Sequence, residues 1–162
     1  MPTYAFAKER VWIEPSATSR AARSPSARDV LHPLLHLNTS NLEQQSYRTT
    51  LTGAEFFLAD HQVRTEHALA RPVLPAVAYL EMARAAIEQA LPDRQADGAL
   101  ELTHATWLQP CVVTSPRELT LALYPREEGE SIDFEILSHM DGEASVHCQG
   151  RATPSDTSAA ER

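Results

Sequence analysis

Four titratable side chains lie within one short stretch of the chain: Asp60, His61, Glu66 and His67. An imidazole has an ordinary pKa of about 6.5, so it can act as a general base near neutral pH. A histidine beside an aspartate is more often one half of a structural hydrogen-bonded pair. The four residues lack any accepted spacing of metal ligands, so no metal site is predicted here.

Other reactive patterns are weaker. His32 and His36 are four residues apart, but Pro33 directly follows His32 and the segment resembles the start of a strand rather than a helix. No glycine-rich phosphate loop is present in the sequence. Three serines lack the context of a nucleophile elbow, namely Ser24, Ser26 and Ser40. The stretch around His61 therefore remains the main candidate for chemistry.

Composition restricts the possible partners. The 162 residues allow one domain with linkers, and 22 acidic against 14 basic residues give a formal charge of −8. An acidic chain with scattered basic residues is a poor nucleic-acid binder. No apolar run approaches the length of a membrane helix, and the start resembles neither a signal peptide nor a transit peptide. We expect a cytoplasmic protein in which Cys111 and Cys148 are buried, reduced thiols.

Three regions differ in composition. Residues 1–31 are predicted to be an inter-domain linker and residues 153–162 a flexible tail, and both are rich in small and polar residues. Such segments bury too little apolar surface to offset the entropy of ordering. Residues 32–152 form the predicted domain.

One helix is predicted over residues 76–90, directly after Pro75 and before Pro92. Most of its circumference is apolar or small, which is typical of a buried helix. Its polar residues are three or four positions apart and form one narrow stripe: Glu81, Arg84, Glu88 and Gln89. We expect this stripe to be the least buried side of the helix.

The remaining patterned segments favour strands, because they alternate and are rich in β-forming residues. They span residues 46–52, 100–108, 118–124, 131–138 and 144–151, with turns predicted at 126–131 and 139–144. A buried helix followed by antiparallel strands predicts an α+β hot-dog fold, a curved antiparallel sheet wrapped around one central helix.

Residues 56–83 resemble the dehydratase domains of modular polyketide synthases, which carry a stretch like FFLADHxVxGxxVLPGVAYLEMA. The matches here run through residues 56–61, 63, 73–75 and 77–83. Residues 32–40, 106–110, 123–131 and 146–152 resemble other strands of that domain, and residues 2–13 resemble the linker that follows a ketosynthase or acyltransferase domain. The chain is identified as the N-terminal hot-dog half of such a dehydratase.

The resemblance implies a role for His61 as the catalytic base that removes the α-proton of a β-hydroxyacyl thioester, so that loss of water gives an α,β-unsaturated thioester. Backbone N–H groups at the helix start would stabilise charge on the thioester carbonyl. The implied substrate path is lined by Val73, Leu74, Pro75, Ala76 and Tyr79. No cofactor is expected; the substrate would arrive on the phosphopantetheine arm of an acyl carrier protein.

Two departures from the family pattern bear on activity. Between Val63 and Val73 the family has four residues including a glycine, whereas this chain has nine and no glycine, so we expect a reshaped pocket wall. Ala76 also stands where the family usually has glycine. The family's second hot dog carries an acidic D-x-x-x-Q/H motif, and none of the aspartates after residue 90 fits it.

Three functions therefore stay open: half of a dehydratase that needs a second hot-dog unit, a non-catalytic remnant that serves structure or carrier-protein docking, and altered chemistry such as pyran formation. The expected partners are an acyl carrier protein, the C-terminal hot-dog half or neighbouring synthase domains, and a second copy of this chain. Nucleic acid and membranes are not expected partners.

Overall fold

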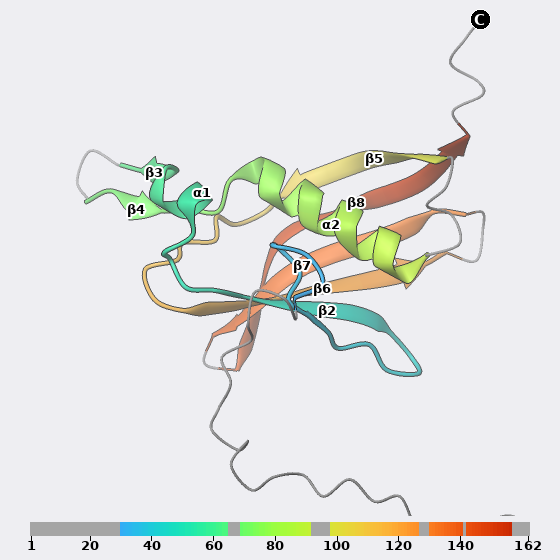
Figure 1. Ribbon diagram of the computed structural model, residues 1–162, viewed down its shortest axis with the longest axis horizontal. Helices are drawn as coiled ribbons and strands as arrows, with labels where there is room; N and C mark the ends of the chain where they lie inside the picture. The colour runs from blue at the N-terminus through green and yellow to red at the C-terminus, as the bar shows by residue number, and fades with distance from the viewer. Residues whose placement is uncertain (1–29, 65–68, 92–97, 127–129, 141, 157–162) are drawn as a thin grey trace, which may run out of the picture.

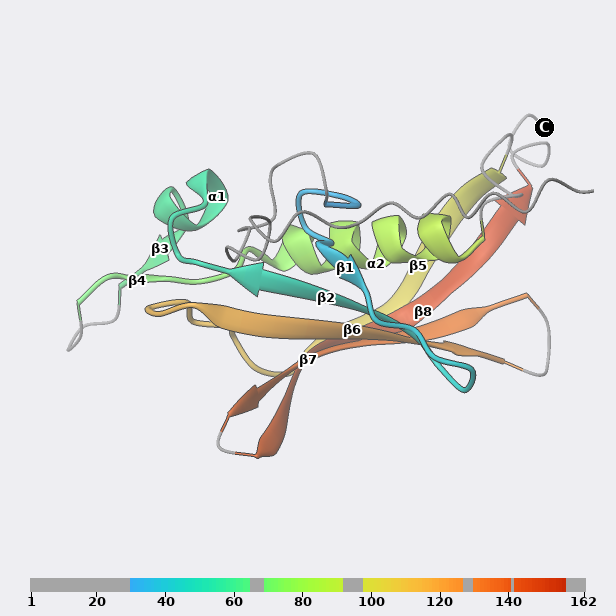
Figure 2. The same cartoon turned by 60° about the horizontal axis from the view of Figure 1, so that its bottom comes forward.

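The computed structural model describes residues 30–64, 69–91, 98–126, 130–140 and 142–156. Six of its strands form one antiparallel sheet in the order β1-β2-β6-β7-β8-β5 (Figure 1). Their bounds are Leu37–Asn38 for β1, Gln45–Leu51 for β2, Gly98–Trp107 for β5, Arg117–Pro125 for β6, Ile132–Met140 for β7 and Glu143–Asp156 for β8. The helix α2, Ala76–Ala90, lies along one face of this sheet (Figure 2). The predicted hot-dog fold is confirmed.

Three short elements lie at the end of the molecule where α2 begins (Figure 1). They are the helix α1, Phe56–Ala59, and the strands β3, Gln62–Val63, and β4, Arg71–Pro72, which pair as a separate two-stranded sheet. The sequence patterns did not predict these elements, because runs of two to four residues are too short for a periodicity to develop.

The buried face of the large sheet follows the two-residue period of its strands. Along β7, Ile132, Phe134 and Ile136 are buried while the residues between them are partly exposed. Both predicted turns join neighbouring strands: Pro125 pairs with Ile132, and Met140 pairs with Glu143. Alternate side chains point to opposite faces of a strand, so one face of the sheet carries the core against α2.

The helix has the predicted bounds, and its polar stripe is its least buried side. Glu81, Arg84 and Glu88 are partly exposed, whereas Ile87 is 2% exposed. Val77 is apolar, yet it is 69% exposed. Positions 77, 81, 84 and 88 are separated by four, three and four residues, so Val77 extends the same stripe toward the helix start.

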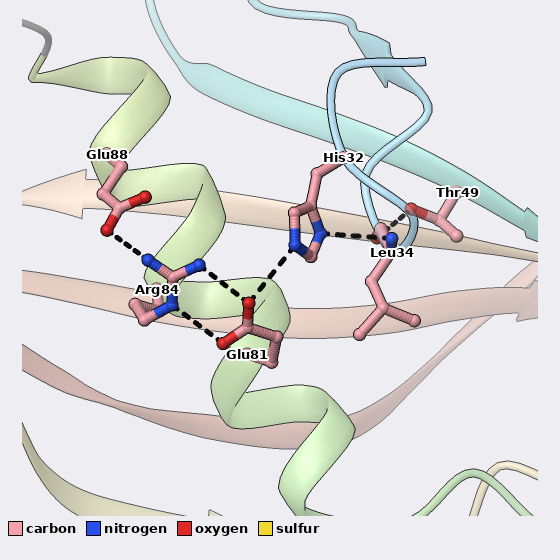
Figure 3. A network of polar contacts seen from close by, with 6 residues as sticks. All are labelled: His32, Leu34, Thr49, Glu81, Arg84 and Glu88. Atoms are coloured by element: carbon pink, nitrogen blue, oxygen red, sulfur yellow. Dashed lines mark hydrogen bonds and ion pairs between the residues drawn. The ribbon is translucent and has the colours of Figure 1, made fainter. Parts of the chain in front are cut away.

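A network of polar contacts joins this stripe to the segment before β1 (Figure 3). His32 Nε2 lies 3.2 Å from Glu81 Oε1, and the guanidinium of Arg84 pairs with both Glu81 and Glu88. Leu34 N–H donates to His32 Nδ1 at 3.2 Å, which leaves Nε2 of a neutral ring to donate to Glu81. Such exposed ion pairs contribute little to stability, so the network mainly fixes where the segment before β1 crosses α2.

One predicted boundary is wrong. The tail was expected to begin at residue 153, but β8 continues to Asp156, and its last residues pair with β5 from Gly98 to Glu101. Composition alone predicts no strand here. Pairing with β5 orders these residues, since a neighbouring strand can order a small polar segment. Residues 157–162 and the predicted linker over residues 1–29 lie outside the described part of the chain.

His147 on β8 is one of the few buried polar side chains in the described residues, at 3% exposed. Its Nε2 lies 2.8 Å from Ser138 Oγ, and its Nδ1 lies 3.1 Å from the backbone oxygen of Gln109. Burial lowers the pKa of His147, because an apolar environment disfavours the charged imidazole.

Cys111 and Cys148 are both free and buried, as expected. Burial raises the pKa of each thiol to about 11, so neither is a ready nucleophile at neutral pH. None of the helices in the described residues is long and apolar enough to span a membrane.

Ile87→Ala should destabilise the fold by about 2–5 kcal/mol, because it leaves a cavity between α2 and the sheet. Val77→Ala, on the exposed side of the same helix, should change the free energy of unfolding by less than about 0.5 kcal/mol. Urea unfolding of both variants measures the difference. Equal effects would contradict the assignment of the buried face.

The lowered pKa of His147 predicts a loss of stability in acid. Below the ordinary pKa of 6.5 the unfolded chain binds a proton at this residue that the folded chain resists binding. The neutral ring of His147 therefore makes its full contribution to the free energy of unfolding above that value. This contribution is lost as the pH falls toward the lowered pKa of the folded state. Urea unfolding from about pH 7 to about pH 5 should show His147→Asn losing less stability than the wild type. Parallel pH profiles would contradict this.

Candidate functional site

His61 lies two residues after the end of α1, and one residue holds both its backbone and its ring. Its Nδ1 lies 2.7 Å from the backbone oxygen of Val73, and Val73 N–H donates to the backbone oxygen of His61 at 3.1 Å. Leu58, fully buried at 0% exposed, anchors α1 to the core on the preceding side. The imidazole is thereby fixed in place although His61 itself is exposed to solvent.

The contact with Val73 also sets the tautomer of His61. A carbonyl oxygen can only accept a hydrogen bond, so Nδ1 must carry the hydrogen. In the neutral ring, Nε2 then keeps a free lone pair. That is the arrangement a general base requires, because the nitrogen that takes the proton must not already hold one.

His61 opens onto a pocket of about 330 Å³ at the start of α2. The lining residues are His61, Val73, Leu74, Ala76, Tyr79, Trp107, Leu108, Gln109 and Pro110. Five of the six residues singled out from the sequence thus surround one space. The sixth, Pro75, is the residue that precedes α2 and does not line the pocket.

The helix start supplies polar groups to the same place. Its first N–H groups, those of Ala76 and Val77, have no acceptor within the helix. Trp107 Nε1 donates to the backbone oxygen of Ala76 at 3.2 Å and so lays the indole against this turn. Donors at a helix start, together with the positive end of the helix dipole, favour negative charge in the pocket.

The wall formed by residues 107–110 was not assigned to the site from the sequence. The segment TWLQP had been matched to the family as a strand, and its final proline, which ends ladder pairing, was the signal that the chain turns away there. Cys111 N–H then donates to Tyr79 Oη at 3.2 Å, and Leu74 N–H donates to the oxygen of Cys111 at 3.0 Å. These bonds join the wall to the segment that leads into α2.

Tyr79 is buried beneath the pocket, 2% exposed. Burial raises the pKa of its phenol well above the ordinary value. The hydroxyl therefore stays protonated near neutral pH. It acts as a neutral hydrogen-bonding group that holds Cys111, rather than as an acid for an acyl group.

Of the inserted residues 64–72, the described ones, 64 and 69–72, do not line the pocket, and the reshaped pocket wall stays a prediction. Gln62 pairs with Pro72 and Val63 with Arg71, which closes the insertion into a hairpin. Val113 N–H donates to the oxygen of Pro72 at 2.9 Å and fixes the hairpin base to the domain. Residues 65–68 of the insertion lie outside the described part of the chain.

The site contains no grouping typical of a metal centre: in the described ranges, no three His, Cys, Asp or Glu side chains lie close enough to hold an ion. Glu66 and His67 fall outside those ranges. The polar groups of the pocket, an imidazole and a helix start, suit proton transfer beside a carbonyl group.

Comparisons with known proteins agree with this geometry. Residues 32–139 match the polyketide synthase dehydratase domain family. The polyketide synthase PksN of Bacillus subtilis is 44% identical over 162 residues, which cover 94% of this chain and 3% of PksN.

Solved structures give the same result. The crystal structure of a trans-AT PKS dehydratase domain from Brevibacillus brevis superposes with a TM-score of 0.71 at 44% identity, covering 78% of this chain and 46% of that one. The dehydratase domain of RzxB from Pseudomonas fluorescens gives 0.68 at 31% identity, covering 78% and 45%. The chain thus spans about half the length of the solved domains it matches. It belongs to the polyketide synthase dehydratase domain family, as its N-terminal hot-dog half.

Proposed function

We propose that this chain supplies the base half of a β-hydroxyacyl-carrier-protein dehydratase in polyketide biosynthesis. The observation that carries the proposal is the placement of His61: its Nδ1 is committed to Val73, and the ring lines a pocket at the start of α2. A free Nε2 in such a pocket is what abstraction of an α-proton needs.

The reaction would divide between the groups of the site as follows. His61 Nε2 takes the α-proton of the β-hydroxyacyl thioester, and the electron pair of that C–H bond forms the new double bond as the β-hydroxyl leaves. Charge that develops on the thioester oxygen is met by the N–H groups of Ala76 and Val77. The leaving oxygen needs a proton from an acid, because hydroxide is a poor leaving group.

The pocket suits an acyl group delivered on an extended arm. Its volume of about 330 Å³ falls at the lower end of the range for small-molecule sites. Val73, Leu74 and Trp107 give it apolar walls, and the polar side chains of its lining include His61, Tyr79 and Gln109. We propose that the substrate is carried on the phosphopantetheine arm of an acyl carrier protein, with no cofactor bound by the domain itself.

The acid must come from outside these residues. No D-x-x-x-Q/H pattern follows residue 90, and the chain matches about half of each solved domain. Two of the residues that line the pocket are exposed apolar ones, Trp107 at 46% and Leu108 at 51%, and Val77, next in sequence to the lining residue Ala76, is 69% exposed. Such a patch is typical of a surface that a partner covers, and we propose that the second hot-dog unit does so.

His61 should show the tautomer that the proposal requires. A long-range ¹⁵N spectrum of the neutral ring should give a protonated Nδ1 and an unprotonated Nε2. His61→Ala identifies the signal by its disappearance. The opposite tautomer would show that Nε2 is not a free base.

The chain alone should not dehydrate a β-hydroxyacyl carrier protein, because each missing acid or base removes about 10²–10⁴-fold in rate. Addition of the C-terminal hot-dog unit of a related dehydratase should restore loss of one water, measured by intact-protein mass spectrometry. His61→Ala in the restored complex should abolish the mass loss.

Three results would contradict this. Turnover by the chain alone that depends on His61 would mean that these residues, or a second copy of the chain, supply the acid. A restored complex in which His61→Ala stays fully active would exclude His61 as the base. A complex that forms without any turnover would favour the non-catalytic function.

A further inference from the structure

The pocket wall at residues 108–110 is held by a buried histidine that takes no part in the chemistry proposed above. His147 on β8 binds this wall twice: its backbone oxygen accepts from Leu108 N–H at 2.9 Å, and its ring Nδ1 lies 3.1 Å from the oxygen of Gln109. β5 ends at Trp107, opposite Cys148. These two bonds therefore hold residues 108 and 109 to β8 beyond the end of the regular strand pairing.

The two ring nitrogens of His147 have different roles. The oxygen of Gln109 only accepts, so Nδ1 carries the hydrogen, and Nε2 then accepts from the hydroxyl of Ser138 at 2.8 Å. Ser138 is itself buried at 1% exposed and fixes the ring from β7. The ring is thus a neutral bridge from the middle of the sheet to the backbone of the pocket wall.

Among the described residues, no hydrogen bond other than these two holds the backbone of residues 108–110. Pro110 has no N–H to donate, and the next bonds, from Cys111 to Tyr79 and from Leu74 to Cys111, lie on the far side of the proline. A backbone shift of about 1 Å in a pocket can cost about a hundredfold in rate. The placement of Leu108, Gln109 and Pro110 relative to His61 is therefore sensitive to the bond at Gln109.

We propose that His147 is a positioning residue for the acyl pocket, acting through the hydrogen bond from its Nδ1 to the backbone oxygen of Gln109. The proposal rests on the proposed function only in naming an acyl thioester as the occupant. The placement of the wall is a property of the free protein, so the two can be tested separately.

Two substitutions of His147 distinguish the role of ring Nδ1 from that of ring Nε2. The side-chain amide of His147→Asn can place a donor near the position of Nδ1, whereas His147→Gln can reach the Ser138 position but withdraws the donor from Gln109. Amide hydrogen exchange in the full chain should then be about tenfold faster at Leu108 and Cys111 in His147→Gln, and within about threefold of wild type in His147→Asn. Unchanged protection of Leu121 and Ile136 in the sheet reports an intact fold.

Ser138→Ala is the matched control, since it removes the other partner of the ring and leaves the bond to Gln109 in place. It should keep the protection of Leu108 and Cys111 close to wild type. Equal loosening in the Asn, Gln and Ala variants would mean that His147 only fills space, and would overturn the proposal.

Occupancy of the pocket gives the second measurement. Trp107 lines the pocket, so its fluorescence in a Trp12→Phe background can follow binding of a β-hydroxybutyryl pantetheine thioester. The Gln variant should bind about tenfold more weakly and the Asn variant within about threefold of wild type. Weakening of both variants to the same extent would again overturn the positioning role.

Failure of the proposed function gives a different result: the wild-type chain would not bind the thioester, while the exchange pattern would still decide the role of His147. Should His147→Gln not fold, the wild-type chain itself supplies a test. Its long-range ¹⁵N spectrum should show His147 protonated at Nδ1 and not at Nε2, and the reverse tautomer would overturn the proposal.

Discussion

Burial of α2 against the six-stranded sheet is the constraint from which the rest of the site follows. Ala83 and Ala86, both at 0% exposed, leave no space between helix and strands, so the helix axis is fixed by the sheet. Its first turn consequently projects past the last paired residue of β5, Trp107. The pocket is the space between that turn and the chain that leaves β5, with Tyr79 as its floor.

The position of His61 relative to that turn depends on a short-range clamp rather than on the core. Two bonds join His61 to Val73, and the β3–β4 pairing closes the base of the insertion between Val63 and Val73. The same clamp sets the tautomer and leaves Nε2 of the neutral ring without a hydrogen, as the proposed role of a base requires.

Much of this could be predicted from residue patterns. Residues 76–90 are bounded by prolines and apolar around most of the circumference, and the long strands show alternation, so both periodicities were visible. The exposure of Val77 could not be predicted, because an apolar residue at the edge of a polar stripe is ambiguous without knowledge of what lies opposite. The strand at residues 153–156 was missed because its order comes from pairing with β5 rather than from its own composition. The wall at residues 107–110 and the ring of His147 were missed because their roles depend on contacts between residues 38 positions apart.

The proposed removal of the α-proton by His61 Nε2 can be measured directly as incorporation of solvent deuterium at the α-carbon of a β-hydroxyacyl group carried on a carrier protein. The enzyme for this measurement is the chain joined to a C-terminal hot-dog unit. Exchange measures proton abstraction even where water is not yet expelled. We expect deuterium exchange at the α-carbon to be at least about 10²-fold faster than the uncatalysed rate, and we expect His61→Ala to abolish this acceleration. Exchange that continues unchanged in His61→Ala would contradict removal of the α-proton by His61.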